Sequence, residues 1–167
     1  MKKAVICTIL LWGVLSAHGQ IKFEVQVGGS NFLGLTFNTA FDFKLTENGN
    51  HYIVPTIGMG VSVPSSEEPP ASIVHFGLNY RYKKWGLGIE VSGFTNSPFW
   101  GKAYVSTYAD IIIYPNANYT FQTKTNWYYK VSAGLYYAYS EKYDLDQSKY
   151  FERRVVPGPG FSVGYKF

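Results

Sequence analysis

The chain has 167 residues, of which 46% are hydrophobic, 19% aromatic and 16% charged. Charged residues usually make up about a quarter of a soluble domain, so this chain is poor in charge. The wealth of aromatic and β-branched residues excludes an intrinsically disordered protein. No stretch reaches the ~18 uncharged apolar residues of a membrane-spanning helix, which excludes a helical membrane bundle. At this length we expect one folded domain.

The N-terminal segment has the three parts of a secretory signal peptide. Two lysines follow the first methionine, an apolar run of 12 residues covers Ala4–Leu15, and small residues stand at Ala17 and Gly19. The apolar run is too short to cross a bilayer, so we expect cleavage after Gly19 rather than an uncleaved anchor. This interpretation divides the chain into a cleaved signal, residues 1–19, and one mature barrel domain, residues 20–167.

The mature chain lacks the patterns of several common site types. Two of the 15 basic residues leave with the signal, and the 13 that remain nearly balance 11 acidic ones, so nucleic acid is not an expected partner. The only cysteine, Cys7, also leaves, so no disulfide is expected. His51 and His75 lie far apart, and no phosphate-binding loop or serine-nucleophile motif is present. We therefore expect no metal and no cofactor.

Apolar and polar residues alternate along almost the whole mature chain, which is typical of β-strands with two different faces. Most alternating segments run 9 to 14 residues, at or above the ~9–11 that a tilted strand needs to cross a bilayer. Turn-forming residues separate them, including the hairpin pair Asn48-Gly49. The eight expected strands are 21–29, 32–45, 51–63, 72–82, 85–95, 102–114, 127–139 and 158–167.

One face of each expected strand carries no Asp, Glu, Lys or Arg, whereas the other is rich in Gly, Ser, Thr and Asn with sparse charges. A water-facing surface is normally richer in Lys and Glu, while the narrow interior of an eight-stranded barrel suits small residues and paired charges. We therefore expect the apolar face to meet lipid rather than to line a lipocalin-like cavity. The ionisable residues expected to form an internal polar network are Lys22, Glu24, Asp42, Lys44, His75, Arg81, Glu90, Asp110, Lys130 and Lys166.

Aromatic residues gather near the expected strand ends, among them Tyr82, Trp85 and Trp127. Transmembrane barrels carry such rings as girdles at both interfaces. The chain also ends as a strand, which a closed barrel needs because a lipid-exposed edge would leave backbone groups without hydrogen bonds. The apolar positions of this last strand are Phe161, Val163, Tyr165 and Phe167.

In its alternation and its C-terminal aromatic strand, the mature chain resembles the small outer-membrane β-barrel proteins of the OmpX and OmpA-transmembrane-domain type, in a form similar to those of Bacteroidota. The resemblance implies a Gram-negative outer membrane as the location. It also implies that the barrel-assembly machinery reads the alternating residues that end at Phe167. A general barrel pattern carries no activity with it.

The expected fold is an all-β, closed, antiparallel, up-and-down transmembrane β-barrel of eight strands, monomeric and with both termini in the periplasm. Ten strands are the alternative, if parts of 115–126 and 150–156 are also extended. Pro55 cannot donate to a ladder and makes the third strand the least secure. The turns 46–50 and 83–84 and the link 115–126 would face the periplasm. The loops expected outside the cell lie near 30–31, 64–71, 96–101 and 140–157.

The sequence favours a barrel embedded in outer-membrane lipid that supports the envelope or presents its loops to an extracellular partner. Side chains fill an eight-stranded barrel, so we expect no large pore, and we expect no catalysis. Two alternatives stay open: a soluble periplasmic or secreted barrel that binds a hydrophobic ligand, and a lipid-modifying enzyme that uses His75, Ser72 and Glu90. The polar residues expected to contact a partner are Glu141, Lys142, Asp144, Asp146, Lys149, Glu152, Arg153 and Arg154.

Overall fold

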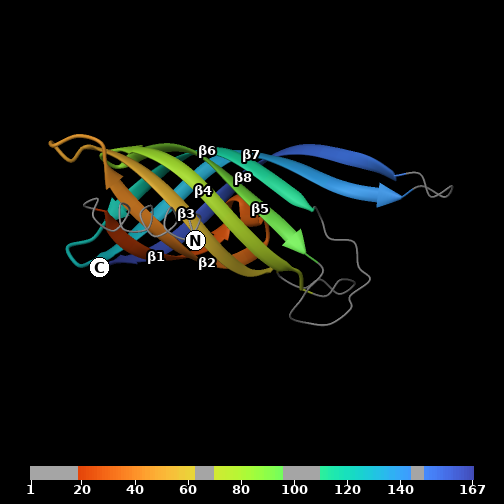
Figure 1. Cartoon of the computed structure of the whole chain (residues 1–167), viewed down its shortest axis with the longest axis horizontal. Coiled ribbons are helices and arrows are strands. Elements are labelled where there is room, and N and C mark those ends of the chain that lie inside the picture. The colour runs from red at the N-terminus through yellow and green to blue at the C-terminus, as the bar shows by residue number, and fades with distance from the viewer. Residues whose placement is uncertain (1–18, 63–69, 96–109, 144–148) are drawn as a thin grey trace, which may run out of the picture.

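The computed structural model describes residues 19–62, 70–95, 110–143 and 149–167, which form one closed β-barrel (Figure 1). Every strand pairs antiparallel with its sequence neighbours, and the last strand pairs with the first, so the expected eight-stranded up-and-down barrel is confirmed. No helix within the described ranges is long and apolar enough to cross a membrane. The strands are β1 (Gln20–Gly28), β2 (Gly34–Lys44), β3 (His51–Ser62), β4 (Ser72–Tyr82), β5 (Trp85–Thr95), β6 (Ile111–Gln122), β7 (Trp127–Tyr143) and β8 (Lys149–Lys166).

The seam between β1 and β8 closes the barrel. Val27 pairs with Phe161, and the N–H of Phe167 donates to the carbonyl of Ile21 at 3.1 Å. The last strand therefore pairs with the first one. Closure of this kind removes both edges of the sheet along the length of β1.

Tight turns join the strands at the end of the barrel where β1 begins and β8 ends, which we call the turn end. In the β2–β3 turn the N–H of Gly49 donates to the carbonyl of Thr46 at 3.0 Å, and Gly49 has a φ of 62°. In the β4–β5 turn Lys83 has a φ of 54°, as a two-residue hairpin turn of the primed type requires. The expected turns at 46–50 and 83–84 are confirmed.

The sixth strand differs from its expected bounds of 102–114. The structure places β6 at Ile111–Gln122, so most of the expected link 115–126 is strand, and only a short turn remains before β7. Pro115 does not end the strand, because it pairs with Ile89 of β5 while the ladder to β7 is interrupted beside it. Alternation continues through Asn116 and Asn118, which are buried. Residues 102–109 lie outside the described residues.

The β7–β8 hairpin is longer than expected and extends past the rim of the barrel (Figure 1). The expected loop 140–157 is mostly a two-stranded ribbon, paired from Trp127 with Tyr165 out to Tyr143 with Lys149. In β8 the backbone N–H groups of odd-numbered residues point toward β1, as the N–H of Phe167 does. Pro157 and Pro159 have no N–H to donate in that direction. Because β1 ends at Gly28, no strand lies beside them on that side, and the ladder loses no hydrogen bond.

Pro55 is likewise accommodated within a continuous β3, where it pairs with Leu78 of β4. On its other side the β2–β3 ladder skips from Ala40–Thr56 to Phe43–Ile53. The expected loops at 64–71 and 96–101 fall largely on residues 63–69 and 96–109, which lie outside the described residues.

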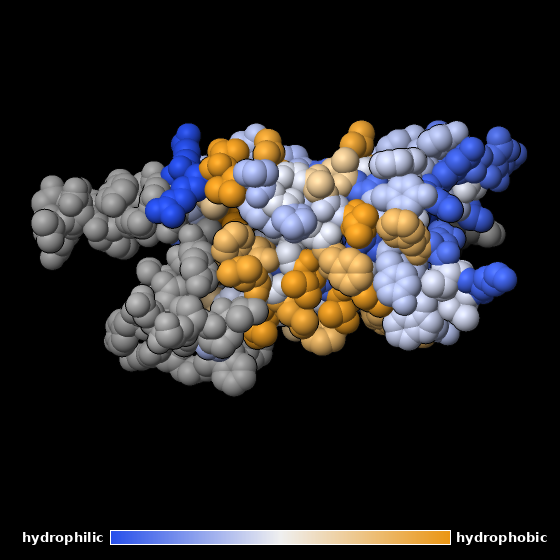
Figure 2. Space-filling model, turned by 180° about the vertical axis from the view of Figure 1, so that it is seen from behind, coloured by the Kyte–Doolittle hydropathy of each residue, from blue (hydrophilic) through white to orange (hydrophobic). Residues whose placement is uncertain are grey.

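The two faces of the strands are oriented as their composition predicts. Apolar side chains of the charge-free face point outward and are widely exposed, for example Phe37 at 63%, Met59 at 66% and Leu87 at 65%. Figure 2 shows these hydrophobic side chains as a band across the middle of the barrel, with paler and hydrophilic residues beyond it at the turn end. The other face points inward and is predominantly polar.

Candidate functional site: the polar barrel interior

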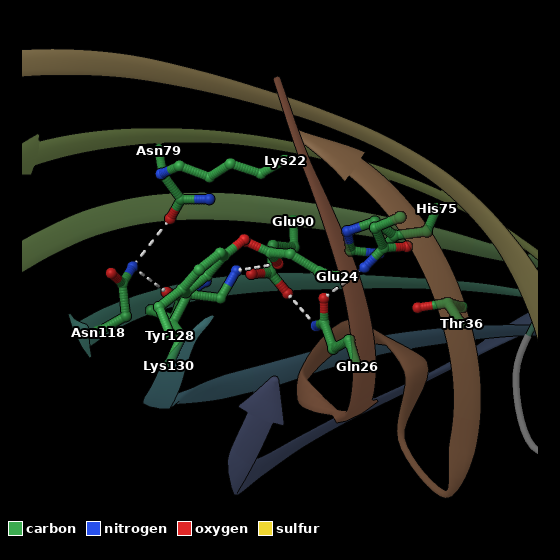
Figure 3. Close-up of polar contacts among 12 residues, drawn as sticks. Lys22, Glu24, Gln26, Thr36, His75, Asn79, Glu90, Asn118, Tyr128 and Lys130 are labelled. Atoms are coloured by element: carbon green, nitrogen blue, oxygen red, sulfur yellow. Dashed lines mark hydrogen bonds and ion pairs between the residues drawn. The ribbon is translucent and has the colours of Figure 1, made fainter. Parts of the chain in front are cut away.

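The barrel interior gathers polar side chains from most strands into connected layers (Figure 3). Of the ten ionisable residues expected in this network, seven are buried inside: Lys22, Glu24, Asp42, His75, Arg81, Glu90 and Lys130.

The other three expected members of the network do not belong to its buried part. Lys44 is exposed at the end of β2, Lys166 is half-buried at the end of β8, and Asp110 is half-buried at a bend before β6. Lys44 and Lys166 do continue the inward phase of their strands, but these strand ends reach the rim of the barrel, where water solvates their charges.

The layer nearest the turn end is built around the Asp42 carboxylate. Asp42 forms an ion pair with Lys22 and accepts two hydrogen bonds from the Arg81 guanidinium, at 2.5 and 3.3 Å. The ring of Tyr52 lies 4.4 Å below the guanidinium carbon, and the ring of Tyr128 lies 5.1 Å from the Lys22 ammonium. One carboxylate therefore holds two buried cations, and aromatic faces give those cations additional stabilisation.

The next layer pairs Glu24 with Lys130. The Glu24 carboxylate accepts hydrogen bonds from the Lys130 ammonium at 2.8 Å and from the Tyr128 hydroxyl at 2.6 Å. Charged hydrogen bonds of this kind are the strong ones, and both partners are buried. Glu24 comes from β1 and Lys130 from β7, so the pair links two strands that lie on either side of β8.

Further from the turn end, side-chain amides take over from ion pairs in the network. Glu90 accepts a hydrogen bond from the Gln26 side chain at 2.9 Å, and Gln26 in turn accepts one from Asn38 at 2.9 Å. A second amide chain lies beside the ionic layers, where Asn118 donates to Asn79 at 2.9 Å and to Asn116 at 3.1 Å.

The β1–β2 connection folds into the barrel instead of forming the outer loop expected near 30–31. A short 3₁₀ turn, η1 (Gly29–Asn31), is fully buried and packs between the upper parts of β5, β6, β7 and β8. Ser30 contacts His75 Nδ1 at 3.0 Å and the Ser92 hydroxyl at 2.8 Å, and Ser92 donates to Asn31 at 2.9 Å. The inward turn exists because Gly28 and Gly29 adopt positive φ.

A cluster of apolar and aromatic side chains closes the interior above η1, and sequence reasoning missed it. These side chains occupy the inward phase of strands that are polar further down: Ile73 precedes His75, and Phe94 follows Ser92. The signal that could have revealed it is the change of the inward-facing positions from polar to apolar residues along these strands. The cluster consists of Ala71, Ile73, Phe94, Ile112, Tyr114 and Tyr136, with Phe32 and Ala138 packed against it.

These layers leave little free space in the lumen. The gap among the charged residues of the two ionic layers measures about 20 Å³, which holds about one water molecule. Tyr114 and Tyr136 further tie the upper lumen to β8 by donating to the carbonyls of Gly158 and Pro159, each at 2.9 Å. The barrel interior is therefore a packed core, polar toward the turn end and apolar and aromatic on the other side of η1.

Within the described part of the chain, no hydrogen bond joins the three residues that the lipid-modifying alternative would use. His75 Nδ1 faces Ser30 and, at 3.2 Å, Ser92, whereas its Nε2 has no hydrogen-bond partner in the described part of the chain. The Ser72 hydroxyl is buried without a hydrogen-bond partner there, and Glu90 is bonded to Gln26. His75 is 1% exposed, so its imidazole is buried.

The C-terminal residues singled out in the sequence lie on the outer surface of β8. Tyr165 contacts Trp127 at 5.3 Å between ring centroids and Phe167 at 5.0 Å, and Phe167 contacts Phe23 of β1 at 5.2 Å. Val163 and Phe161 continue this row, so the closing seam carries an outward aromatic cluster at the turn end.

The polar residues expected as a partner surface belong to the β7–β8 ribbon. Arg153 and Arg154 are exposed, and the Arg153 guanidinium lies 5.7 Å from the ring of Tyr139. The backbone of Glu141, Lys142, Lys149 and Glu152 is strand, and Asp144 and Asp146 lie outside the described residues.

Among the residues that the structure describes, no three His, Cys, Asp or Glu side chains gather in a way that could hold a metal ion. Comparison with protein-family models, with curated proteins and with solved structures finds no match.

Proposed function

We propose that this chain is an integral β-barrel of a bacterial outer membrane, with a structural or loop-mediated interaction role and without catalysis or a large pore. The observation that carries the proposal is the combination of an outward apolar band with a packed, hydrogen-bonded polar core. In water such a surface would be a severe aggregation liability, whereas in hydrocarbon it is the stable arrangement.

The dimensions of the band support this location. Strands β4 and β5 have 11 residues each. At ~3.3 Å per residue and a tilt of ~40° they rise by about 28 Å, close to the ~25 Å apolar band of outer-membrane barrels. Aromatic rings edge the band at the turn end, where Trp85 packs on Tyr119 at 4.7 Å and Trp127 on Tyr165. Such rings favour the level of the lipid headgroups.

The interior argues against the ligand-binding alternative. A lipocalin-like barrel turns its apolar face inward around a cavity. Here ion pairs such as Asp42–Arg81 and Glu24–Lys130 occupy that volume, and the apolar depressions of about 360 and 400 Å³ lie on the outer surface. A buried ionic core also supports the absence of a large pore, because its side chains fill the cross-section.

Biogenesis follows from the same proposal. Residues 1–19 would direct export and be removed, and the outward row that ends at Phe167 would be read by the barrel-assembly machinery. The barrel would be a monomer of the kind represented by OmpX, with the turn end and both termini in the periplasm. The β7–β8 ribbon, with Arg153 and Arg154, would then project outside the cell as the surface for a partner.

Fractionation of cells that express the full chain tests the location. We expect the protein to sediment with the outer membrane, to need detergent for extraction, and to migrate differently on gels before and after boiling. Release with the periplasm would contradict the proposal.

A matched pair of variants gives a second test of the location. Phe76→Arg places a charge in the middle of the outer band, where we expect a loss of about 2–4 kcal/mol in the free energy of unfolding in lipid vesicles. Leu45→Arg places the same charge in the β2–β3 turn, where the loss should be close to zero. Equal effects of the two variants would argue against a hydrocarbon environment around the band.

A further inference from the structure

A hollow at the turn end of the barrel is lined by charged and amide side chains. It measures about 430 Å³, within the range of small-molecule sites, and lies below the Asp42 layer. Figure 2 shows hydrophilic side chains gathered at this end of the barrel. We call this hollow the basic mouth. Its lining residues are Gln20, Asp42, Lys44, Gly49, Asn50, Tyr52, Arg81, Lys83, Lys84, Gln122 and Lys166.

The charges around the basic mouth do not balance. Among the residues that the structure describes, five cationic side chains line it and Asp42 is the only carboxylate in the lining. That carboxylate already binds Lys22 and Arg81, so it is not available to the lysines of the mouth. Within the described part of the chain, none of the four lysines lining the mouth has an ion-pair partner. A multiply charged anion would supply the negative charge that these lysines lack within the protein.

The lysines are held on well-anchored elements. Lys44 and Lys166 continue the inward phase of β2 and β8 to the rim. In the β4–β5 turn, the N–H of Lys83 donates to Asn50 at 2.8 Å, and the carbonyl of Lys84 accepts from Thr120 at 2.8 Å. These bonds tie the β4–β5 turn to the β2–β3 turn and to β6, so the charges converge on one hollow from a prearranged frame.

We propose that the basic mouth binds a small anion that carries two or more phosphate charges. Phosphate fits because the point-like ammonium groups of several lysines can share its oxygens. The amides of Gln122 and Asn50 add donors at the same hollow. A free phosphorylated compound suits the position better than a lipid headgroup, because aromatic side chains such as Tyr82 and Trp85 occupy the outer surface at this rim.

Titration calorimetry tests the proposal on the mature barrel in a nonionic detergent, with sodium pyrophosphate as the probe at about 50 mM salt to limit screening. The test variant is Lys44→Gln/Lys84→Gln/Lys166→Gln. It leaves Lys83 in place, whose ammonium lies 5.3 Å from the ring of Tyr82. The control is Lys124→Gln, which removes an exposed lysine from the β6–β7 turn at the same end.

We expect pyrophosphate to bind the wild-type barrel and the control alike, and to bind the triple variant about tenfold more weakly, since each exposed charge contact contributes modestly. A second arm compares how well the barrel retains vesicles that contain phosphatidylglycerol and vesicles of phosphatidylcholine alone. If the triple variant loses retention of the phosphatidylglycerol vesicles but binds pyrophosphate like the wild type, the phosphate is that of a lipid headgroup. Absence of both effects, or equal losses in the triple variant and in Lys124→Gln, would overturn the proposal. Because the mouth is defined without reference to lipid, its failure would leave the proposed membrane location untouched.

Discussion

Replacing Asp42 by asparagine removes the charge that holds the turn-end layer together. Asp42 is 2% exposed and binds both Lys22, at 1% exposure, and Arg81, at 6%. Asp42→Asn keeps the shape of the side chain but leaves two buried cations without their carboxylate. Breaking a buried pair by removing one partner costs about 3–5 kcal/mol, and here two cations share the partner, so we expect a loss at the upper end of that range.

Urea unfolding of the barrel in lipid vesicles, followed by tryptophan fluorescence, measures this loss. Glu47→Gln is the matched control, because Glu47 is an exposed carboxylate in the β2–β3 turn, and its effect should stay within about 0.5 kcal/mol. Adding Lys22→Met and Arg81→Met to Asp42→Asn removes the stranded charges and should restore most of the stability. If Asp42→Asn behaves like Glu47→Gln, the layer around Asp42 is not a low-dielectric ionic core.

Three further outcomes follow from the interior. Gly29→Ala should destabilise the barrel by about 1–3 kcal/mol in the same urea assay, because Gly29 has a φ of 60° and an added methyl would meet Gln26 at 2.8 Å and Glu90 at 3.1 Å. Gly93→Ala, with its nearest contact at 4.0 Å, is the control, and equal losses would refute the packing of η1. Planar-bilayer recordings should show no large stable conductance, and a steady open channel would contradict the filled lumen. His75→Ala should leave the acylation of cellular lipid A unchanged, whereas an altered pattern would revive the enzymatic alternative.

Strict alternation predicted much of the fold, because a strand with two unlike faces allows one orientation. The bounds of β4 and β5 match the expected 72–82 and 85–95. The buried pairs Glu24–Lys130 and Asp42–Arg81 unite residues that were all assigned to the inward face. Which charges pair was not predictable, because partners such as Glu24 and Lys130 are set by strand order and stagger rather than by local pattern.

Other features depend on tertiary context that the sequence pattern does not contain. Pro115 and Asn116 have loop chemistry, yet pairing with β5 keeps them in β6. The part of β8 that precedes Gly160 is charged and contains Pro157 and Pro159. It still pairs with β7 in one uninterrupted register out to Tyr143 and Lys149. The inward fold of η1 could not be predicted, because the sequence pattern does not show that the lumen next to Gln26 has room for it.

The most direct test of the central claim is the environment of the outer band. Cysteines at Ile57, Phe76 and Ile89, in the middle of three adjacent strands, can carry spin labels in vesicles. We predict that molecular oxygen, which concentrates in hydrocarbon, relaxes these labels more than a water-soluble nickel chelate does. A label at Glu47 in the β2–β3 turn should show the reverse. Labels in the band that respond chiefly to the nickel chelate would contradict a barrel whose apolar face meets lipid.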